Sequence, residues 1–389
     1  MRLSIIYLCV ILFGCKKSNQ SQEIPPYHYQ GLIDKQINFS PSIIKTNNLL
    51  YFQQSYQKSV CLDFNIQELL PTISSPQAIQ ILPNGSSITP MNFNFSNWAQ
   101  QVKSTGANLC FVTINTGYGF SLFDSKTPWP IPSQLWDTTG TTFASNFPSG
   151  KVLPQYTKYD VGQGANPNFF DQFCQAMRAQ GIEPAVYIPV VTDINRLGGN
   201  IFDGQPQALI NAFEYWFCCY VQEIILRYNI KYIWFDQLNY ASANFMQKIY
   251  NAVKSVTGQG TSNECMVIGN AAPGSIGSGG TWPIDINAFE YAIWYGSSTP
   301  TIWETDKFIN GTNYYIPIQM VDAVAQNEYY YQNCSGCSGY GTFANQSLSQ
   351  LTTEWKDCQK YGAGFCIFIP VDWEGNIPIS SISLIGSIY

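Results

Sequence analysis

The sequence predicts an α/β fold, a (β/α)8 TIM-like barrel formed by a single domain. Three observations predict it: eight apolar runs have the length of strands, helical patterns separate several of them, and one run ends abruptly in a carboxylate. The chain has 389 residues, which is enough for one large barrel. No internal repeat or second domain is evident, so we assign residues 51–389 to the barrel.

The eight strands are expected where apolar runs are too short for helices. They cover residues 60–64, 108–115, 183–188, 231–235, 265–269, 288–294, 314–318 and 364–369. Apolar runs that alternate with helices are typical of parallel strands, which are buried on both faces. After Cys265, loops rich in Gly and Ser replace obvious helices, so we expect the barrel to be irregular in its second half.

Helical patterns are clearest over residues 168–180, 208–228 and 243–256. In the last of these, an apolar stripe runs from Phe245 to Val256 along one face. Ser242 can cap the amino end of this helix, and Gly258 suits its carboxyl end. Both ends of this helix are therefore marked in the sequence.

The amino terminus has the pattern of an export signal. Met1 and Arg2 give a positive start, and residues 3–13 form an apolar core that is too short to span a bilayer. The sequence Leu-Phe-Gly-Cys ends at Cys15 and resembles the lipobox of bacterial lipoproteins, in which the Cys is lipid-modified. We expect residues 1–15 to be a lipoprotein-type signal peptide and residues 16–50 to be a tether. The protein is then exported, either anchored to a membrane by its lipid or secreted.

The composition points to a sugar rather than to nucleic acid. Charged residues make up only 11% of the chain, against roughly 25% in average soluble proteins. Aromatic residues reach 15%, with 25 Tyr and 10 Trp, which suit sugar-binding clefts but also fit an aromatic-rich core. A net charge of −6 without basic runs argues against nucleic acid. We therefore expect a glycan or glycoconjugate substrate, and contact with a membrane only through the lipid anchor.

The cysteines give little sign of a metal site. Cys334 and Cys337 form a single CxxC motif in a loop rich in Gly and Ser. One such pair without a second pair or His ligands favours a local disulfide over zinc, and disulfides persist in exported proteins. Three further cysteines fall within predicted strands and are expected to be buried thiols: Cys61, Cys110 and Cys366. No metal and no cofactor is expected.

The stretch from Asn229 to Gln237 says most about function. It reads Asn-Ile-Lys-Tyr-Ile-Trp-Phe-Asp-Gln and follows a helical pattern, which places Asp236 at the C-terminal tip of a buried parallel strand. In (β/α)8 barrels, catalytic groups lie at this end of the strands because the loops there form the mouth of the site. An Asp that caps the next helix or begins a turn is the alternative.

Five segments carry motifs in a fixed order along the chain. They are residues 97–126, residues 233–236 (Ile-Trp-Phe-Asp), residues 288–291 (Ala-Phe-Glu-Tyr), residues 303–304 (Trp-Glu), and residues 362–378, which end Ile-Pro-Val-Asp-Trp-Glu-Gly-Asn-Ile-Pro. Over residues 60 to 389 this order resembles the family 29 glycoside hydrolases, the α-L-fucosidases. The resemblance implies a single catalytic barrel in which Asp236 is the nucleophile and Glu290 the general acid/base.

This pairing agrees with the chemistry of retaining glycosidases. They need two carboxyl groups roughly 5–5.5 Å apart, one to attack the anomeric carbon and one to protonate the leaving oxygen. The two environments must differ, so that one group stays ionised while the other holds a proton. The alternative for Glu290 is a carboxylate in a surface turn. Glu304 is then a second candidate acid, a sugar-binding group, or a solvated loop residue.

Aromatic and polar residues are candidates for holding the sugar. Trp129 and Trp234 could stack on the sugar ring, although core packing also accounts for Trp234. Asn65, Asn115 and Tyr118 could bind hydroxyl groups, because their side chains both donate and accept hydrogen bonds.

The chain differs from the α-L-fucosidase family in lacking the histidines that the family carries at two places. Residues 115–120, Asn-Thr-Gly-Tyr-Gly-Phe, stand where the family carries Lys-His-His-Asp-Gly-Phe, and the first-strand region 60–65 lacks the family's His-Trp-Gly. The one His of the chain is His28, in the expected tether. Each lost partner of a sugar hydroxyl typically costs about 1–3 kcal/mol, so the pocket must have been rebuilt for fucose or must accept a related sugar. The lack of His also argues against a metal site and a Ser-His-Asp triad.

Two functions are therefore open. The first is an exported retaining glycosidase that removes a terminal sugar, fucose or a related one, from glycans. The alternative is a catalytically inactive, carbohydrate-binding surface lipoprotein on the same barrel. The separation of the Asp236 and Glu290 carboxyls distinguishes them, because a gap beyond about 10 Å exceeds even the spacing of inverting enzymes.

Overall fold

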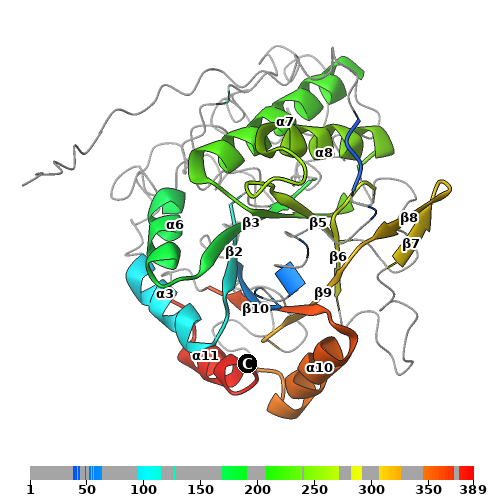
Figure 1. The fold of residues 1–389 in the computed structure, drawn as a ribbon. Coiled ribbons are helices and arrows are strands. Elements are labelled where there is room, and N and C mark those ends of the chain that lie inside the picture. Colours follow the sequence, from blue (N-terminus) through cyan, green and yellow to red (C-terminus); the bar gives the residue numbers. More distant parts are fainter. Residues whose placement is uncertain are drawn as a thin grey trace, which may run out of the picture.

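The fold is known from a computed structural model that describes part of the chain. The described residues are 38–41, 43, 49, 52–53, 55, 57–63, 94–114, 127, 169–190, 207–238, 241–270, 282–290, 306–325, 345–371 and 376–389. They form a closed barrel of parallel strands with helices around it (Figure 1). The (β/α)8 barrel predicted from the sequence is thereby confirmed.

Eight strands make up the barrel. They are β1 (Lys58–Asp63), β2 (Leu109–Thr113), β3 (Glu183–Pro189), β4 (Tyr232–Asp236), β5 (Met266–Asn270), β6 (Ile286–Glu290), β9 (Ile318–Ala323) and β10 (Gly364–Pro370). Each strand pairs in parallel with the next, and β1 closes the barrel by pairing with both β2 and β10. All C-terminal strand ends therefore lie at the same end of the barrel.

Helices surround this sheet. They are α3 (Phe95–Ser104), α6 (Phe169–Ala179), α7 (Gln207–Tyr228), α8 (Ala243–Thr257), α10 (Leu348–Tyr361) and α11 (Ile379–Gly386), and α7 and α8 lie side by side (Figure 1). The three helices predicted from periodicity correspond to α6, α7 and α8. As expected, the Ser242 hydroxyl accepts a hydrogen bond from the Phe245 amide at 3.0 Å, and Gly258 ends α8 with a φ of 72°.

The second half of the barrel differs from a regular alternation. The antiparallel hairpin of β7 (Asp306–Ile309) and β8 (Thr312–Tyr315) lies between β6 and β9 and projects from the side of the barrel (Figure 1). This hairpin agrees with the irregularity that the sequence predicts there.

The prediction of a barrel strand at residues 314–318 is wrong. Tyr314 and Tyr315 belong to β8, and the barrel strand is β9. The sequence pattern does not reveal β9, because two polar residues interrupt its apolar run. Gln319 faces the barrel interior and donates to Ser59 Oγ at 3.1 Å, and Asp322 accepts a hydrogen bond from Gln346 at 2.9 Å. Each of these side chains makes a hydrogen bond within the fold, and a search for apolar runs does not detect such partners.

Two hydrophobic cores follow from the alternation of side chains along the strands. In β4, Ile233 and Phe235 belong to the core between sheet and helices, whereas Tyr232 and Trp234 belong to the core inside the barrel. Successive side chains of a strand point to opposite faces. Asp236, two residues after Trp234, therefore lies on the inner face, at the mouth of the barrel.

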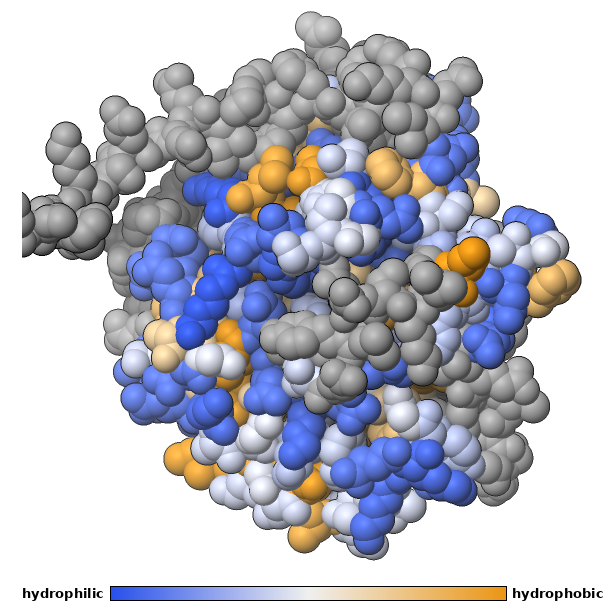
Figure 2. Space-filling view, viewed as in Figure 1, coloured by the Kyte–Doolittle hydropathy of each residue, from blue (hydrophilic) through white to orange (hydrophobic). Residues whose placement is uncertain are grey.

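All eight described cysteines are buried, and they include the three predicted buried thiols, Cys61, Cys110 and Cys366. Cys334 and Cys337 lie outside the described residues. None of the described helices is both long and apolar enough to cross a membrane. The face seen in Figure 2 is largely hydrophilic where it is described, with hydrophobic residues in small separate patches.

A buried ion network fixes the strands that follow α8. Lys254 is fully buried, and its Nζ lies 2.6 Å from both Glu264 Oε1 and Asp285 Oδ2. Asp285 also accepts hydrogen bonds from Tyr250 at 2.6 Å and from the Val267 amide at 2.7 Å. Burial acts to lower the pKa of Lys254, but the carboxylates of Asp285 and Glu264 outweigh it and raise this pKa. The network ties α8 to β5 and to the start of β6.

We expect Lys254→Met to lower the free energy of unfolding by about 3–5 kcal/mol, because it leaves two buried carboxylates without their cation. Urea denaturation followed by circular dichroism measures the change. Lys103→Met is the control, since Lys103 is exposed in the last turn of α3 and should change stability by no more than about 0.5 kcal/mol. Equal stability of the two variants would show that the network contributes nothing.

Candidate active site

Polar side chains line up at the C-terminal ends of six successive barrel strands. The residues are Asp63 on β1, Thr113 on β2, Tyr187 on β3, Asp236 on β4, Asn270 on β5 and Glu290 on β6. Below them, the interior of the barrel is filled by apolar and aromatic side chains, including Phe111, Trp234 and Phe368. These polar side chains therefore lie above a floor of mostly apolar and aromatic residues, at the end of the barrel where catalytic groups lie.

Asn270 joins the two predicted catalytic carboxyl groups. Its Nδ2 donates to Asp236 Oδ1 at 2.8 Å and lies 3.5 Å from Glu290 Oε1. These two oxygens can be no further apart than the sum of the two distances. Their separation is therefore at most about 6.3 Å, near the spacing of retaining glycosidases and far below 10 Å.

Tyr187 holds the other oxygen of Asp236. Its hydroxyl donates to Asp236 Oδ2 at 2.5 Å. Burial raises the pKa of Tyr187, and the charges of Asp236 and Asp63 raise it further. The phenol therefore keeps its proton and remains a donor at neutral pH. With Asn270 on one side and Tyr187 on the other, the carboxylate of Asp236 is fixed in orientation while it stays partly exposed.

A third carboxyl group, Asp63, occupies the tip of β1. Thr113 Oγ1 donates to Asp63 Oδ1 at 2.7 Å, and the side chain is almost completely buried. Burial raises the pKa of Asp63 to about 7, the hydrogen bond from Thr113 acts in the opposite direction, and the charge of Asp236 raises it further. The carboxyl groups at the mouth thus have different environments, since Asp63 is almost completely buried and Asp236 is partly exposed.

The other sequence-predicted site residues have separate positions. Trp234 is only 1% exposed and packs edge-on against Phe111, Tyr187 and Phe368 beneath the mouth. It forms the floor of the site, and its indole Nε1 has no hydrogen-bond partner among the described residues. Five predicted binding residues, Asn65, Asn115, Tyr118, Trp129 and Glu304, and the predicted lipidation site Cys15, lie outside the described residues.

The sequence reasoning missed Asp63, Tyr187 and Asn270. Asp63 and Asn270 carry the same signal as Asp236, since each ends an apolar strand with a polar side chain. Applying the end-of-strand rule to every predicted strand would have found Asn270, which follows residues 265–269, whereas the predicted strand 60–64 extends one residue beyond Asp63. Tyr187 has no such signal, because it lies before the end of β3 and is an ordinary strand residue.

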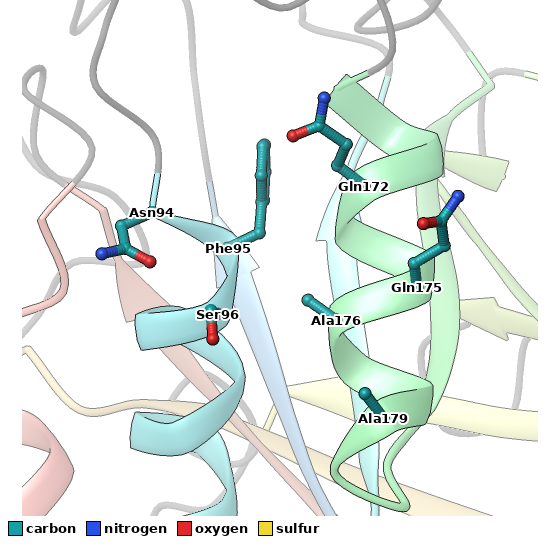
Figure 3. A pocket seen from close by; sticks show the side chains of 7 residues that line it. All are labelled: Asn94, Phe95, Ser96, Gln172, Gln175, Ala176 and Ala179. Carbon is teal, nitrogen blue, oxygen red and sulfur yellow. The ribbon is translucent and has the colours of Figure 1, made fainter.

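A shallow groove lies apart from the mouth, between α3 and α6 on the outside of the barrel (Figure 3). Phe95 and the amide side chains of Asn94, Gln172 and Gln175 are among its lining residues. None of its lining residues is titratable, so the groove offers no acid, base or nucleophile. Among the described residues there is also no group of three or more His, Cys, Asp and Glu side chains placed to hold a metal ion.

A (β/α)8 barrel with two carboxyl groups joined across its mouth has the architecture of a glycoside hydrolase. The family model described as alpha-L-fucosidase matches residues 84–367. The chain belongs to this α-L-fucosidase family. Comparison with curated protein sequences gives no match.

Solved structures of α-L-fucosidases share the fold. A family 29 enzyme from Bacteroides thetaiotaomicron superimposes with a TM-score of 0.61 at 11% identity, covering 90% of this chain and 75% of that one. An unliganded α-L-fucosidase from Lactobacillus casei gives a TM-score of 0.57 at 14% identity, over 88% and 97% of the two chains. Isoenzyme 1 from Paenibacillus thiaminolyticus gives 0.56 at 12% identity, over 88% and 74%.

We expect Asp63→Asn to flatten the fall in stability between about pH 4 and pH 7. The folded state keeps the Asp63 proton up to about pH 7, whereas the unfolded chain loses it near the ordinary value of 3.8. Unfolding therefore releases a proton in this window, and the wild type loses up to about 1.4 kcal/mol per pH unit relative to the variant. Urea denaturation of both proteins at pH 4.5, 5.5 and 6.5 measures the difference. Parallel stability curves would contradict the raised pKa.

Proposed function

We propose that the protein is a retaining glycosidase of the α-L-fucosidase type, which removes a terminal fucose or a related sugar from glycans. The observation that carries this proposal is the position of Asn270 between Asp236 and Glu290. One amide in contact with both groups keeps the two carboxyls at a spacing that suits a covalent glycosyl intermediate.

In the proposed mechanism, Asp236 attacks the anomeric carbon while Glu290 protonates the leaving oxygen. The bond from carbon to the leaving group breaks as the bond to Asp236 forms. Glu290 then accepts a proton from water, and the resulting hydroxide attacks the anomeric carbon and releases Asp236. Tyr187 and Asn270 orient the Asp236 carboxylate by donating to its two oxygens.

Two further facts support this proposal. Family membership supports a fucose-like substrate. One of the similar structures, from Bacteroides thetaiotaomicron, is described as a trapped covalent intermediate in complex with 2-fluoro-fucosyl fluoride. A covalent intermediate of that kind needs a nucleophile and an acid/base at short spacing, and Asp236 and Glu290 fit these two roles here.

The inactive, carbohydrate-binding surface lipoprotein remains the second candidate. The observation in its favour is that the chain has a single His, His28, so residues 115–120 carry none of the histidines that the α-L-fucosidase family has in that stretch. The close approach of the two carboxyls weighs against it, because a binding protein does not need that spacing. The two candidates differ in whether the chain turns over a glycoside.

We expect Asp236→Ala to lower kcat by about 10³-fold or more, because the variant has no nucleophile. The assay is release of 4-nitrophenol from a panel of aryl glycosides, with the α-L-fucoside first. Glu183→Gln is the control, since Glu183 is a carboxylate at the start of β3, at the opposite end of the barrel from the mouth, and its removal should leave kcat unchanged. An unchanged rate in Asp236→Ala would remove Asp236 from the mechanism.

Covalent trapping separates the two candidate functions. Incubation with 2-fluoro-fucosyl fluoride should add one fluorosugar to the wild type in intact mass spectra, and none to Asp236→Ala. Glu290→Ala should lose most activity on substrates with poor leaving groups. On substrates with good leaving groups, azide should restore part of the rate by attacking the glycosyl intermediate, with the glycosyl azide as product. Glycan binding without labelling or turnover would support the inactive surface protein.

We further propose that the chain is exported through its first 15 residues and that Cys15 carries the lipid. The positive start, the short apolar core and the Leu-Phe-Gly-Cys sequence support this proposal. We expect the protein produced in a bacterial host to incorporate an alkyne fatty acid, visible after dye coupling on a gel, and Cys15→Ser to abolish the label. Labelling that persists in Cys15→Ser would place the lipid elsewhere.

A further inference from the structure

We propose that Asp63, held in place by Thr113, binds a hydroxyl group of the sugar that Asp236 attacks and thereby helps to determine which sugar is accepted. This inference rests on the proposed glycosidase function and adds to it a residue that selects the substrate.

The fold gives Asp63 a fixed place at the mouth. Its main-chain oxygen accepts a hydrogen bond from the Val371 amide at 3.1 Å, and its neighbour on β10 in the barrel register is Pro370. Thr113 Oγ1 donates to Oδ1 at 2.7 Å. Oδ2 accepts no hydrogen bond from any described residue, although the side chain is only 8% exposed.

Asp285, a buried acid with a structural task, has a different set of hydrogen-bond partners. Asp285 accepts hydrogen bonds at both oxygens, from Tyr250, Lys254 and the Val267 amide. A buried carboxyl oxygen without a donor costs free energy, and the surroundings of Asp285 supply donors to both of its oxygens. Asp63 has a hydroxyl donor on one oxygen and no cation beside it in the described part of the chain. A ligand hydroxyl would supply the missing partner.

The groups around Asp63 determine whether its carboxyl is neutral or ionised when it binds the sugar. The groups that influence it or respond to it are Thr113 on β2, Cys61 on its own strand, Tyr187 on β3 and Asp236 on β4. Burial and the charge of Asp236 keep Asp63 protonated up to about pH 7. A neutral carboxyl both donates and accepts a hydrogen bond, as a sugar hydroxyl does. It also adds no second negative charge beside Asp236.

The test compares Asp63→Ala and Asp63→Asn at pH 6, on whichever aryl glycoside the wild type hydrolyses. We expect Asp63→Ala to raise KM about tenfold or more, with kcat changed less than about threefold, because a binding contact is lost. Asn keeps an acceptor for Thr113 and a donor for the sugar, so Asp63→Asn should retain KM within about threefold. In the wild type KM should rise above pH 7, and in Asp63→Asn this rise should be absent.

Deoxy analogues of the same glycoside identify the hydroxyl. Removal of the hydroxyl that Asp63 binds should make KM insensitive to Asp63→Ala, whereas the other deoxy analogues should keep the full effect. Glu183→Gln is the matched control, because Glu183 is a partly buried carboxylate at the opposite end of the barrel, on β3. It should leave KM unchanged for every analogue.

The other possible results also either support or overturn the role of Asp63 in sugar binding. An unchanged KM in Asp63→Ala overturns the proposal. So does a loss confined to kcat that grows with the pKa of the leaving group, since it would make Asp63 the general acid. If the wild type hydrolyses nothing, the proposed function fails and calorimetry with L-fucose, D-galactose and L-rhamnose replaces kinetics. Binding weakened tenfold by Asp63→Ala then supports the part of the inference that assigns sugar binding to Asp63, and no binding of any of them overturns it.

Discussion

The two-residue period of eight parallel strands is the constraint on which the site depends. Because the strands run in the same direction, their C-terminal ends form one rim. Because side chains alternate, every second residue on each strand faces the interior. Asp236 and Asn270 lie side by side for this reason: Phe235 pairs with Gly269 in the register of β4 and β5, and the next residue of each strand faces inward. A one-residue shift in register would turn one of these groups toward the helices.

The buried acids of the protein have three kinds of surroundings. These surroundings distinguish acids that stabilise the fold from acids that are placed to bind or attack a substrate. Asp285 is compensated by a buried lysine and by several donors, which makes it part of the frame. Glu354 on α10 lies against Asp322, and burial together with that neighbour raises the pKa of Glu354 to about 9, so the pair carries a proton at neutral pH. The mouth carboxyls instead meet uncharged donors: Thr113, Tyr187 and Asn270. At Asp236, Tyr187 and Asn270 orient the carboxylate without neutralising it, so its charge remains available to a substrate.

A fucosidase-type barrel without site histidines is chemically reasonable. Sugar hydroxyls need partners that donate and accept hydrogen bonds, and amides, phenols and neutral carboxyls do both. Asn270, Tyr187 and Asp63 supply these three groups at the mouth. The floor beneath them is closed by Trp234 and its aromatic neighbours, which lowers the local dielectric and strengthens each polar contact above it. The side chains that bind the sugar can therefore change at the C-terminal ends of the strands while the barrel itself stays the same.

The sequence by itself determined the barrel, most of its strands, three of its helices and the strand-end position of Asp236, because these depend on local apolar periodicity. It also pointed to Glu290, through a motif. Only the tertiary structure decided that Asn270 touches both carboxyls, that Tyr187 donates to Asp236, and that β9 rather than residues 314–318 completes the barrel. These facts join residues up to 49 positions apart, or depend on polar side chains whose partners lie on other strands. Local patterns carry no information about such partners, since contact across a barrel is set by register and closure, not by neighbours in the chain.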